Sequence, residues 1–247
     1  MNFRRVFISI IIFSIFVTGC AKDKEKTKNV VADKATQQKT MTKVQNDVNE
    51  IMNKDYNYVI KNMGKPYCAT YYIDLDIIDE SNIKSLSELN QVTNMRLIYP
   101  KSTSSNELEK SALYIELNSN NVSEVQTYEF SEYDIKDGIV DEGVDLIIDM
   151  YDEQSNLSLK SVQNLDFKSY VGGELDKLNN IIDTNLGNFE AYDRERKKSV
   201  IGYLLKDNND KNNKILTIYE TNNKIDDIKI IDSNNIVELV KKYITKN

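Results

Sequence analysis

The spacing of apolar residues predicts that a helical segment precedes a run of strands. From Met41 to Met63, apolar side chains recur at steps of three and four, the period of one amphipathic helix or of two abutting helices. Thr42 and Gln45 fit a capping box near the start of this segment. Gly64, followed by Pro66, marks its end, because glycine tolerates the left-handed turn after a helix and proline blocks further helix.

Beyond Pro66 the apolar period drops to two, which indicates strands. The first strand, Tyr67–Ile77, puts tyrosine and aliphatic side chains on one face and Cys68, Asp74 and Asp76 on the other. The polar stretch Ile78–Asn94 after it has room for a short helix. Four more strands are expected at Met95–Tyr99, Ala112–Leu117, Val122–Phe130 and Val144–Met150.

A similar pattern restarts after Ser155. An apolar stripe from Leu175 to Leu186 predicts a helix that stops at Gly187. A last helix begins near Asn235, which forms a capping-box-like pair with Glu238. Between the two helices, strands are expected at Val200–Lys206, Ile215–Glu220 and Lys224–Ile231.

These elements predict an α+β fold of tandem modules, each a helix followed by an antiparallel β-meander, with a closing C-terminal helix. The modules would span residues 41–154 and 155–247. Both halves contain a helix that ends in glycine and a strand–Asn-Asn–strand stretch, and asparagine tolerates the positive φ of a tight hairpin. The alternative is that the two halves arrived independently at common local solutions.

The N-terminal region follows a different pattern. Residues 1–19 begin with Arg4 and Arg5 and continue into an apolar core, Val6–Val17, that is too short to span a bilayer comfortably. This order predicts a secretory signal peptide, and the alternative is an uncleaved membrane anchor. Residues 20–40 are polar and rich in lysine without apolar periodicity, so we expect a disordered tether.

The end of the apolar core, Val17-Thr18-Gly19-Cys20, resembles the lipobox of bacterial lipoproteins. The resemblance implies cleavage before Cys20 and acylation of its thiol, with diacylglycerol and fatty chains such as palmitate. It also implies a lipid anchor that holds the chain at the extracytoplasmic face of the cell membrane. Two acyl chains bury enough methylene groups for stable anchoring without a protein helix.

Charge narrows the classes of partner. The formal net charge is −7, and about −9 once Arg4 and Arg5 are removed. The tether carries about +3, and its lysines either approach anionic lipid or serve as a solvated spacer. The remainder carries about −12, which argues against nucleic acid as a partner. The abundance of Asn, Ile and Lys is typical of low-GC Gram-positive bacteria.

The sequence offers little for catalysis. It contains no histidine, which excludes Ser-His and Cys-His pairs and the commonest zinc ligand. Cys68 has no disulfide partner once Cys20 is acylated, and its place on a strand suggests a filler position. Asp74 and Asp76, on one strand face, form the best carboxylate pair for a hydrolase. We predict no catalytic residue and no cofactor.

Two polar loops are rich enough in acidic and amide side chains to suggest calcium sites. The acidic segment 134–145 fails the EF-hand spacing, because Asp134 and Asp137 stand three apart and no glutamate follows at the required place. Segment 206–214 puts lysine where a ligand should stand. Solvated loops are the preferred interpretation of both, so no metal site is predicted, although a weak calcium site in 134–145 stays open.

The helix-to-strand corner carries a second resemblance. This corner resembles that of SmpA/OmlA and β-lactamase-inhibitor-like modules, where an aliphatic residue precedes a Leu-Gly-x-Pro step. The matching positions are Val59, Met63, Gly64, Lys65 and Pro66. The resemblance implies a non-enzymatic envelope or inhibitor module whose sheet binds other proteins. The second half departs from this pattern, since no proline follows Gly187.

The sequence therefore favours a lipid-anchored, extracytoplasmic, non-catalytic binding protein. Its partner, an envelope protein or a small ligand, is not identified. One alternative is a solute-binding lipoprotein of a transporter, although βαβ alternation is missing from the predicted order. The other is a carboxylate-dependent envelope hydrolase.

Overall fold

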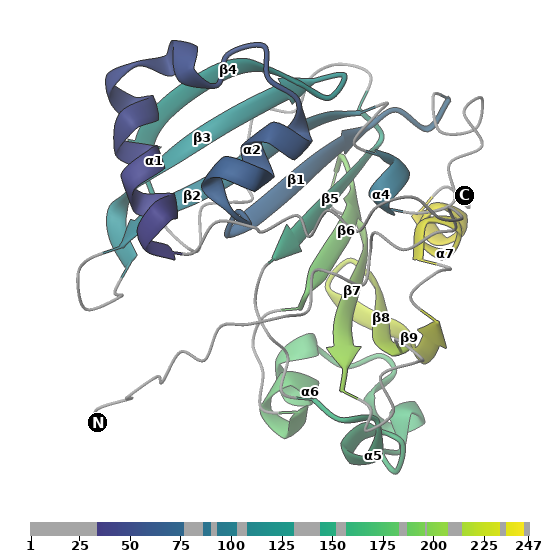
Figure 1. Ribbon diagram of the computed structural model, residues 1–247. Helices are drawn as coiled ribbons and strands as arrows, with labels where there is room; N and C mark the ends of the chain where they lie inside the picture. Colours follow the sequence, from purple (N-terminus) through teal and green to yellow (C-terminus); the bar gives the residue numbers. More distant parts are fainter. Residues whose placement is uncertain are drawn as a thin grey trace, which may run out of the picture.

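The computed structural model describes residues 34–76, 86–89, 93–102, 108–130, 144–151, 157–182, 187–195, 197–206, 214–232 and 236–244. The strands in these ranges form one antiparallel sheet of nine, in the order β4-β3-β2-β1-β5-β6-β7-β8-β9 (Figure 1). They are β1 (Cys68–Ile73), β2 (Asn94–Ser102), β3 (Leu108–Asn118), β4 (Asn121–Glu129), β5 (Leu146–Tyr151), β6 (Phe189–Asp193), β7 (Lys198–Leu205), β8 (Lys214–Thr221) and β9 (Lys224–Asp232).

The helices are short and lie at several places along the sheet (Figure 1). They are α1 (Lys34–Asn46), η2 (Val48–Glu50), α2 (Tyr56–Met63), α4 (Leu86–Leu89), α5 (Leu159–Val162), η3 (Phe167–Tyr170), α6 (Leu175–Ile182) and α7 (Ile236–Ile244). None of these described helices combines the length and the apolar character that a bilayer span requires.

The prediction for the first helical segment is confirmed in its main features. The segment breaks into α1 and α2, and Gly64 ends α2 with a φ of 73°. The predicted capping box is wrong, because α1 starts at Lys34 and the Thr42 hydroxyl donates to the Gln38 carbonyl inside the helix. The N-terminal cap of α2 is Asp55, which accepts a bond from the backbone N–H of Tyr58.

The predicted tandem modules are wrong, although the broad α+β class stands. Strand β5 pairs with β1 on one side and with β6 on the other, so the strands before and after residue 154 belong to one continuous sheet. Apolar periodicity predicts most of the strands and both asparagine hairpins, but it does not predict which distant strands pair. The division at residue 154 into separate folding units stays a prediction.

The two faces of the sheet carry different helices. On face one, α1, α2 and α7 pack over a core that includes Ala69 and Tyr71 of β1 and Ile148 of β5. On face two, α5, η3 and α6 pack over the last strands, against side chains such as Tyr203 and Ile218. Because side chains alternate along a strand, these two cores lie on opposite sides of the sheet.

Strand β1 alternates as predicted but is buried on both sides. Ala69 and Tyr71 enter the core of face one, while Cys68 and Thr70 lie on face two. The strand ends at Ile73, earlier than Ile77. The Asp74 carboxylate there accepts a bond from the Asp76 backbone N–H at 2.9 Å, a local turn that competes with the strand.

Both predicted hairpin turns are present. Asn222 and Asn223 have φ angles of 51° and 61°, as expected for an Asn-Asn turn. In the other hairpin the positive angles fall one residue earlier than expected, at Ser119 and Asn120, with values of 45° and 73°.

A short backbone clamp holds the outer edge of each terminal strand. At β4, Asn53 donates to the Val122 carbonyl at 3.0 Å, and the Val122 N–H donates to Lys54 at 2.9 Å. At β9, Gly172 donates to the Ile225 carbonyl at 2.8 Å, and the Ile225 N–H donates to Gly173 at 3.0 Å. These bonds satisfy backbone groups that an edge strand otherwise leaves open.

Candidate functional site: a polar row on face two

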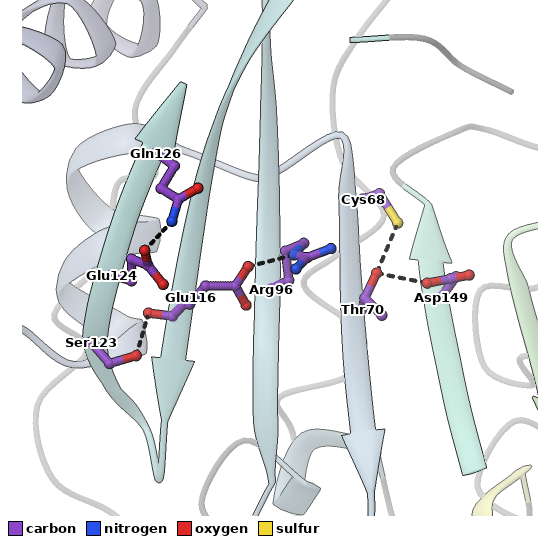
Figure 2. A network of polar contacts seen from close by, with 8 residues as sticks. All are labelled: Cys68, Thr70, Arg96, Glu116, Ser123, Glu124, Gln126 and Asp149. Atoms are coloured by element: carbon purple, nitrogen blue, oxygen red, sulfur yellow. Dashed lines mark hydrogen bonds and ion pairs between the residues drawn. The ribbon is translucent and has the colours of Figure 1, made fainter. Parts of the chain in front are cut away.

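A row of polar side chains crosses face two from the edge strand β4 to β6, perpendicular to the strands. Each member lies opposite the next in the strand registers, so neighbouring Cβ atoms are about 5 Å apart. We call this set the polar row; its members are Glu124, Glu116, Arg96, Thr70, Asp149 and Glu190. Figure 2 shows the first five of them on successive strands.

Arg96 is the cation of the polar row. Its Nε lies 2.5 Å from Glu116 Oε1, and the two side chains are 23% and 27% exposed. The guanidinium carbon lies 5.8 Å from the ring centre of Tyr72 and 6.0 Å from that of Tyr114. Although burial lowers the pKa of Arg96, Tyr72 and Glu116 raise it overall, so this side chain is a fixed positive charge.

Asp149, next to Glu190, is the most buried member of the polar row and is 1% exposed. Its two carboxylate oxygens accept bonds from the Thr70 hydroxyl at 2.6 Å and from the Tyr192 hydroxyl at 3.0 Å. A buried carboxylate costs free energy unless hydrogen bonds replace water. Because the two donors come from β1 and β6, Asp149 on β5 ties the three central strands together.

Cys68 lies beside this anchor, where its Sγ is 3.9 Å from the Thr70 hydroxyl oxygen (Figure 2). The side chain is fully buried. Burial raises the pKa of the thiol, and the nearby Asp149 raises it further. A reactive cysteine needs a stabilised, accessible thiolate, so the interpretation of Cys68 as a filler position is supported.

The β4 end of the polar row is open. A register shift leaves Ser123 as an extra residue, whose hydroxyl donates to the Glu116 carbonyl at 3.3 Å. Next to it the Gln126 amide donates to the Glu124 carboxylate (Figure 2). Tyr128, further along β4, is 57% exposed, and its ring meets that of Tyr114 edge-on at 5.7 Å. The row therefore runs from a buried anchor to an exposed charged and aromatic edge.

The structure separates the predicted hydrolase pair from any strand face. Asp74 and Asp76 both follow the end of β1, and the Asp74 carboxylate is engaged by the Asp76 backbone N–H. The Asp145 carboxylate next to them accepts from the Leu75 N–H at 3.2 Å. The prediction of paired carboxylates on one strand face is wrong, because the strand is shorter than its apolar pattern suggested.

The other predicted site residues are not brought to the polar row. Cys20, Asp134 and Asp137 lie outside the described residues, as does most of segment 206–214. Among the residues that are described, no three His, Cys, Asp or Glu side chains come close enough to hold a metal ion. A groove of about 480 Å³ lies on η3 and β9, away from the strands of the row, and Val171 and Asp227 are among its lining residues.

Sequence reasoning missed the polar row, although a signal was present. Arg96, Glu116 and Asp149 are each flanked by apolar residues within a strand, and a charge in such a setting needs a partner. The partners come from strands that are distant in the sequence, so the pairing required the sheet order.

Comparisons with known proteins give one weak structural likeness. No family model and no curated protein matches the chain. A crystal structure described as a "putative beta-lactamase inhibitor protein" from Streptococcus mutans matches 77% of this chain and 96% of its own. The sequence identity is 8% and the TM-score is 0.25. The description loosely agrees with the inhibitor-like resemblance of the helix-to-strand corner, but at this TM-score the likeness supports no conclusion about fold or activity.

Proposed function

We propose that this protein is a lipid-anchored extracytoplasmic binding protein that recognises a partner through the open end of the polar row. The observation that carries the proposal is the combination of Arg96, its aromatic neighbours and the exposed β4 edge on one side of the sheet. Tyrosine and arginine are the residues that most often dominate protein interfaces.

The bonding within the polar row favours recognition over catalysis. Arg96 is held by Glu116, and Asp149 is held by two hydroxyls, so these groups are fixed by neighbours on rigid strands. Fixed side chains lose little conformational entropy when a partner binds, which favours a preorganised interface. A partner that offers apolar or aromatic groups to Tyr114 and Tyr128, beside the Arg96–Glu116 pair, fits this surface.

The anchor is the second part of the proposal, and the lipobox at Cys20 supports it. A lipidated chain carries diacylglycerol on Cys20 and lacks residues 1–19, which intact-mass spectrometry of the membrane fraction detects. Cys20→Ala abolishes the modification and shifts the chain out of that fraction. An unmodified chain that keeps its leader would overturn this part and leave the binding surface to be judged by itself.

A photo-crosslinking experiment tests the binding surface. A benzophenone amino acid replaces Tyr128 on face two in one variant and Tyr58, 38% exposed on α2, in a matched control. In native membranes the Tyr128 variant should capture a discrete partner that the Tyr58 variant does not. Adding Arg96→Gln should reduce the capture at least tenfold. Equal capture from both positions would contradict the proposal.

The same proteins distinguish the solute-binding alternative. A metabolite that occupies a site stabilises the folded chain by mass action, so its melting temperature rises with ligand concentration. We expect no such rise across a metabolite panel, whereas the captured partner should raise it. A small molecule that stabilises the chain and is displaced by Arg96→Gln would favour the solute-binding alternative.

A further inference from the structure

Positive charge is concentrated on the helical layer of face one. Residues 34–65 contain six lysines against Asp47, Glu50 and Asp55, a net charge of about +3. Residues 66–247 contain 20 basic and 33 acidic residues, a net charge of about −13. The chain is therefore strongly polarised, and α1 and α2 with their connection hold its basic part.

The lysines of this layer point away from the sheet. In α1, Met41 and Val44 are buried, whereas Lys39 and Lys43 are exposed on the opposite side of the helix. In α2, Val59 and Met63 are buried and Lys61 is exposed. We call the exposed set the lysine surface; its members are Lys34, Lys39, Lys43, Lys54 and Lys61.

Three members of the lysine surface lie outside the ion pairs of the described residues. Lys39, Lys43 and Lys61 form no ion pair within the described part of the chain. On the last strands, in contrast, Lys214 pairs with Asp232 at 2.7 Å and Lys224 pairs with Glu174 at 2.8 Å. The charges of Lys39, Lys43 and Lys61 are therefore available to an external anion.

Aromatic and apolar groups accompany the lysines. Tyr58 is 38% exposed on α2, and the Lys54 ammonium lies 5.4 Å from its ring centre. Val48 is 39% exposed in η2, between the two helices. Tyrosine next to lysine suits the headgroup region of a bilayer, where one end of the side chain is wet and the other is apolar.

We infer that the lysine surface lies against an anionic lipid bilayer and turns face two away from it. The inference rests on the proposed membrane anchor, because Ala21 to Lys34 is only fourteen residues and spans at most about 50 Å. A tether of this length keeps α1 near the bilayer but sets no orientation. Attraction of the lysine surface to anionic headgroups supplies the orientation. Helices α1 and α2 cover face one (Figure 1), and the side chains of the polar row lie on the opposite face by strand alternation.

Vesicle sedimentation tests the surface without the anchor. The chain from residue 20 with Cys20→Ser carries no lipid, so failure of lipidation does not affect the result. It should bind vesicles that contain phosphatidylglycerol but not vesicles of pure phosphatidylcholine. It should dissociate from the anionic vesicles in about 0.5 M salt, because salt screens electrostatic attraction. Replacing Lys39, Lys43 and Lys61 by Gln should weaken partitioning about fivefold per lysine, on the order of a hundredfold in total.

The matched control removes the same charge from the opposite side. Lys160, Lys168 and Lys177 lie exposed on α5, η3 and α6, over face two. Their replacement by Gln should change partitioning less than twofold. Equal losses in both triple variants would overturn the inference, because attraction would then depend on net charge alone. Absence of binding to the anionic vesicles would overturn it as well.

Fluorescence quenching reports the orientation directly. Asn57→Cys on α2 and Tyr128→Cys on β4 each carry a dye in the Cys20→Ser background, where the buried Cys68 resists labelling. Brominated anionic lipid should quench the dye at residue 57 and leave the dye at residue 128 unchanged. Equal quenching of the two dyes would contradict the orientation.

Discussion

Face two of the sheet has two regions with opposite chemistry. Over the last strands, α5, η3 and α6 cover an apolar core in which Leu178 and Ile218 are fully buried. Over the first strands, a smaller buried cluster around Cys68 and Phe130 lies beside the polar row, which opens toward Tyr128, 57% exposed. The two regions of this face therefore differ in burial and polarity, and the consequences for stability can be measured.

The largest effect is expected in the covered region. Leu178→Ala leaves a cavity beneath α6, and we expect it to lower the free energy of unfolding by about 2–5 kcal/mol. Ile181→Ala on the same helix is the control, since Ile181 is 52% exposed and its truncation should cost less than about 0.5 kcal/mol. Urea denaturation measures both, and similar losses would show that α6 does not cover a packed core.

A smaller loss is expected at the buried anchor of the polar row. Thr70→Val and Tyr192→Phe each remove one donor from the Asp149 carboxylate and should cost about 1–3 kcal/mol in the free energy of unfolding. The double variant should deviate from additivity because both bonds end on one carboxylate. Tyr128→Phe provides the exposed control, and strict additivity would argue against a shared anchor.

Alkaline pH should destabilise the fold through Cys68. Burial raises the pKa of this thiol in the folded protein, whereas the unfolded chain loses the proton near the ordinary value. The unfolded state therefore binds fewer protons at high pH, so stability falls as pH rises. Between pH 8.5 and 9.5 the loss should be on the order of 1 kcal/mol. In the Cys68→Ala variant, this part of the decrease in the free energy of unfolding with pH should disappear. An unchanged pH dependence would assign the decrease to other groups.

The smallest effect on stability is expected at the open end of the polar row. Arg96 and Glu116 are about a quarter exposed, so solvent screening limits their pairing energy to about 1 kcal/mol or less. A double-mutant cycle with Arg96→Gln and Glu116→Gln measures it. We expect little change in the free energy of unfolding together with a large loss of photo-crosslinked partner at residue 128. A coupling of several kcal/mol would show that this end stabilises the fold as the anchor does.

The sequence predicted elements well and assembly poorly. Eight of the nine described strands follow from the local apolar period. Local period and turn chemistry also predict the helices α2, α6 and α7 and the asparagine turns, as with Gly64 at the end of α2. Strand β6 was missed, because Phe189–Asp193 is short and lacks a clear alternation. Its pairing depends on Gly202, where a Cβ atom would lie 1.8 Å from the Phe189 ring.

The candidate site was harder to predict from the sequence than the elements were, because it depends on long-range strand pairing. Thr70 and Asp149 are 79 residues apart, and their contact exists only because β5 enters the sheet next to β1. The carboxylate pair at Asp74 and Asp76 was predicted from alternation continued beyond Ile73, whereas a side-chain-to-backbone bond turns the chain there. Local rules therefore found candidate groups but not the long-range pairing that makes a site.

The clamps on the two terminal strands have a consequence for crowded surfaces. Molecules confined to two dimensions meet often, and an open strand edge would let neighbours join by backbone pairing into fibrous stacks. The backbone N–H groups of Val122 and Ile225 already donate to Lys54 and Gly173 of their own chain. The edge of each terminal strand is therefore occupied next to its hairpin turn, and a neighbouring strand cannot pair there. High surface density is then compatible with individual molecules that remain separate.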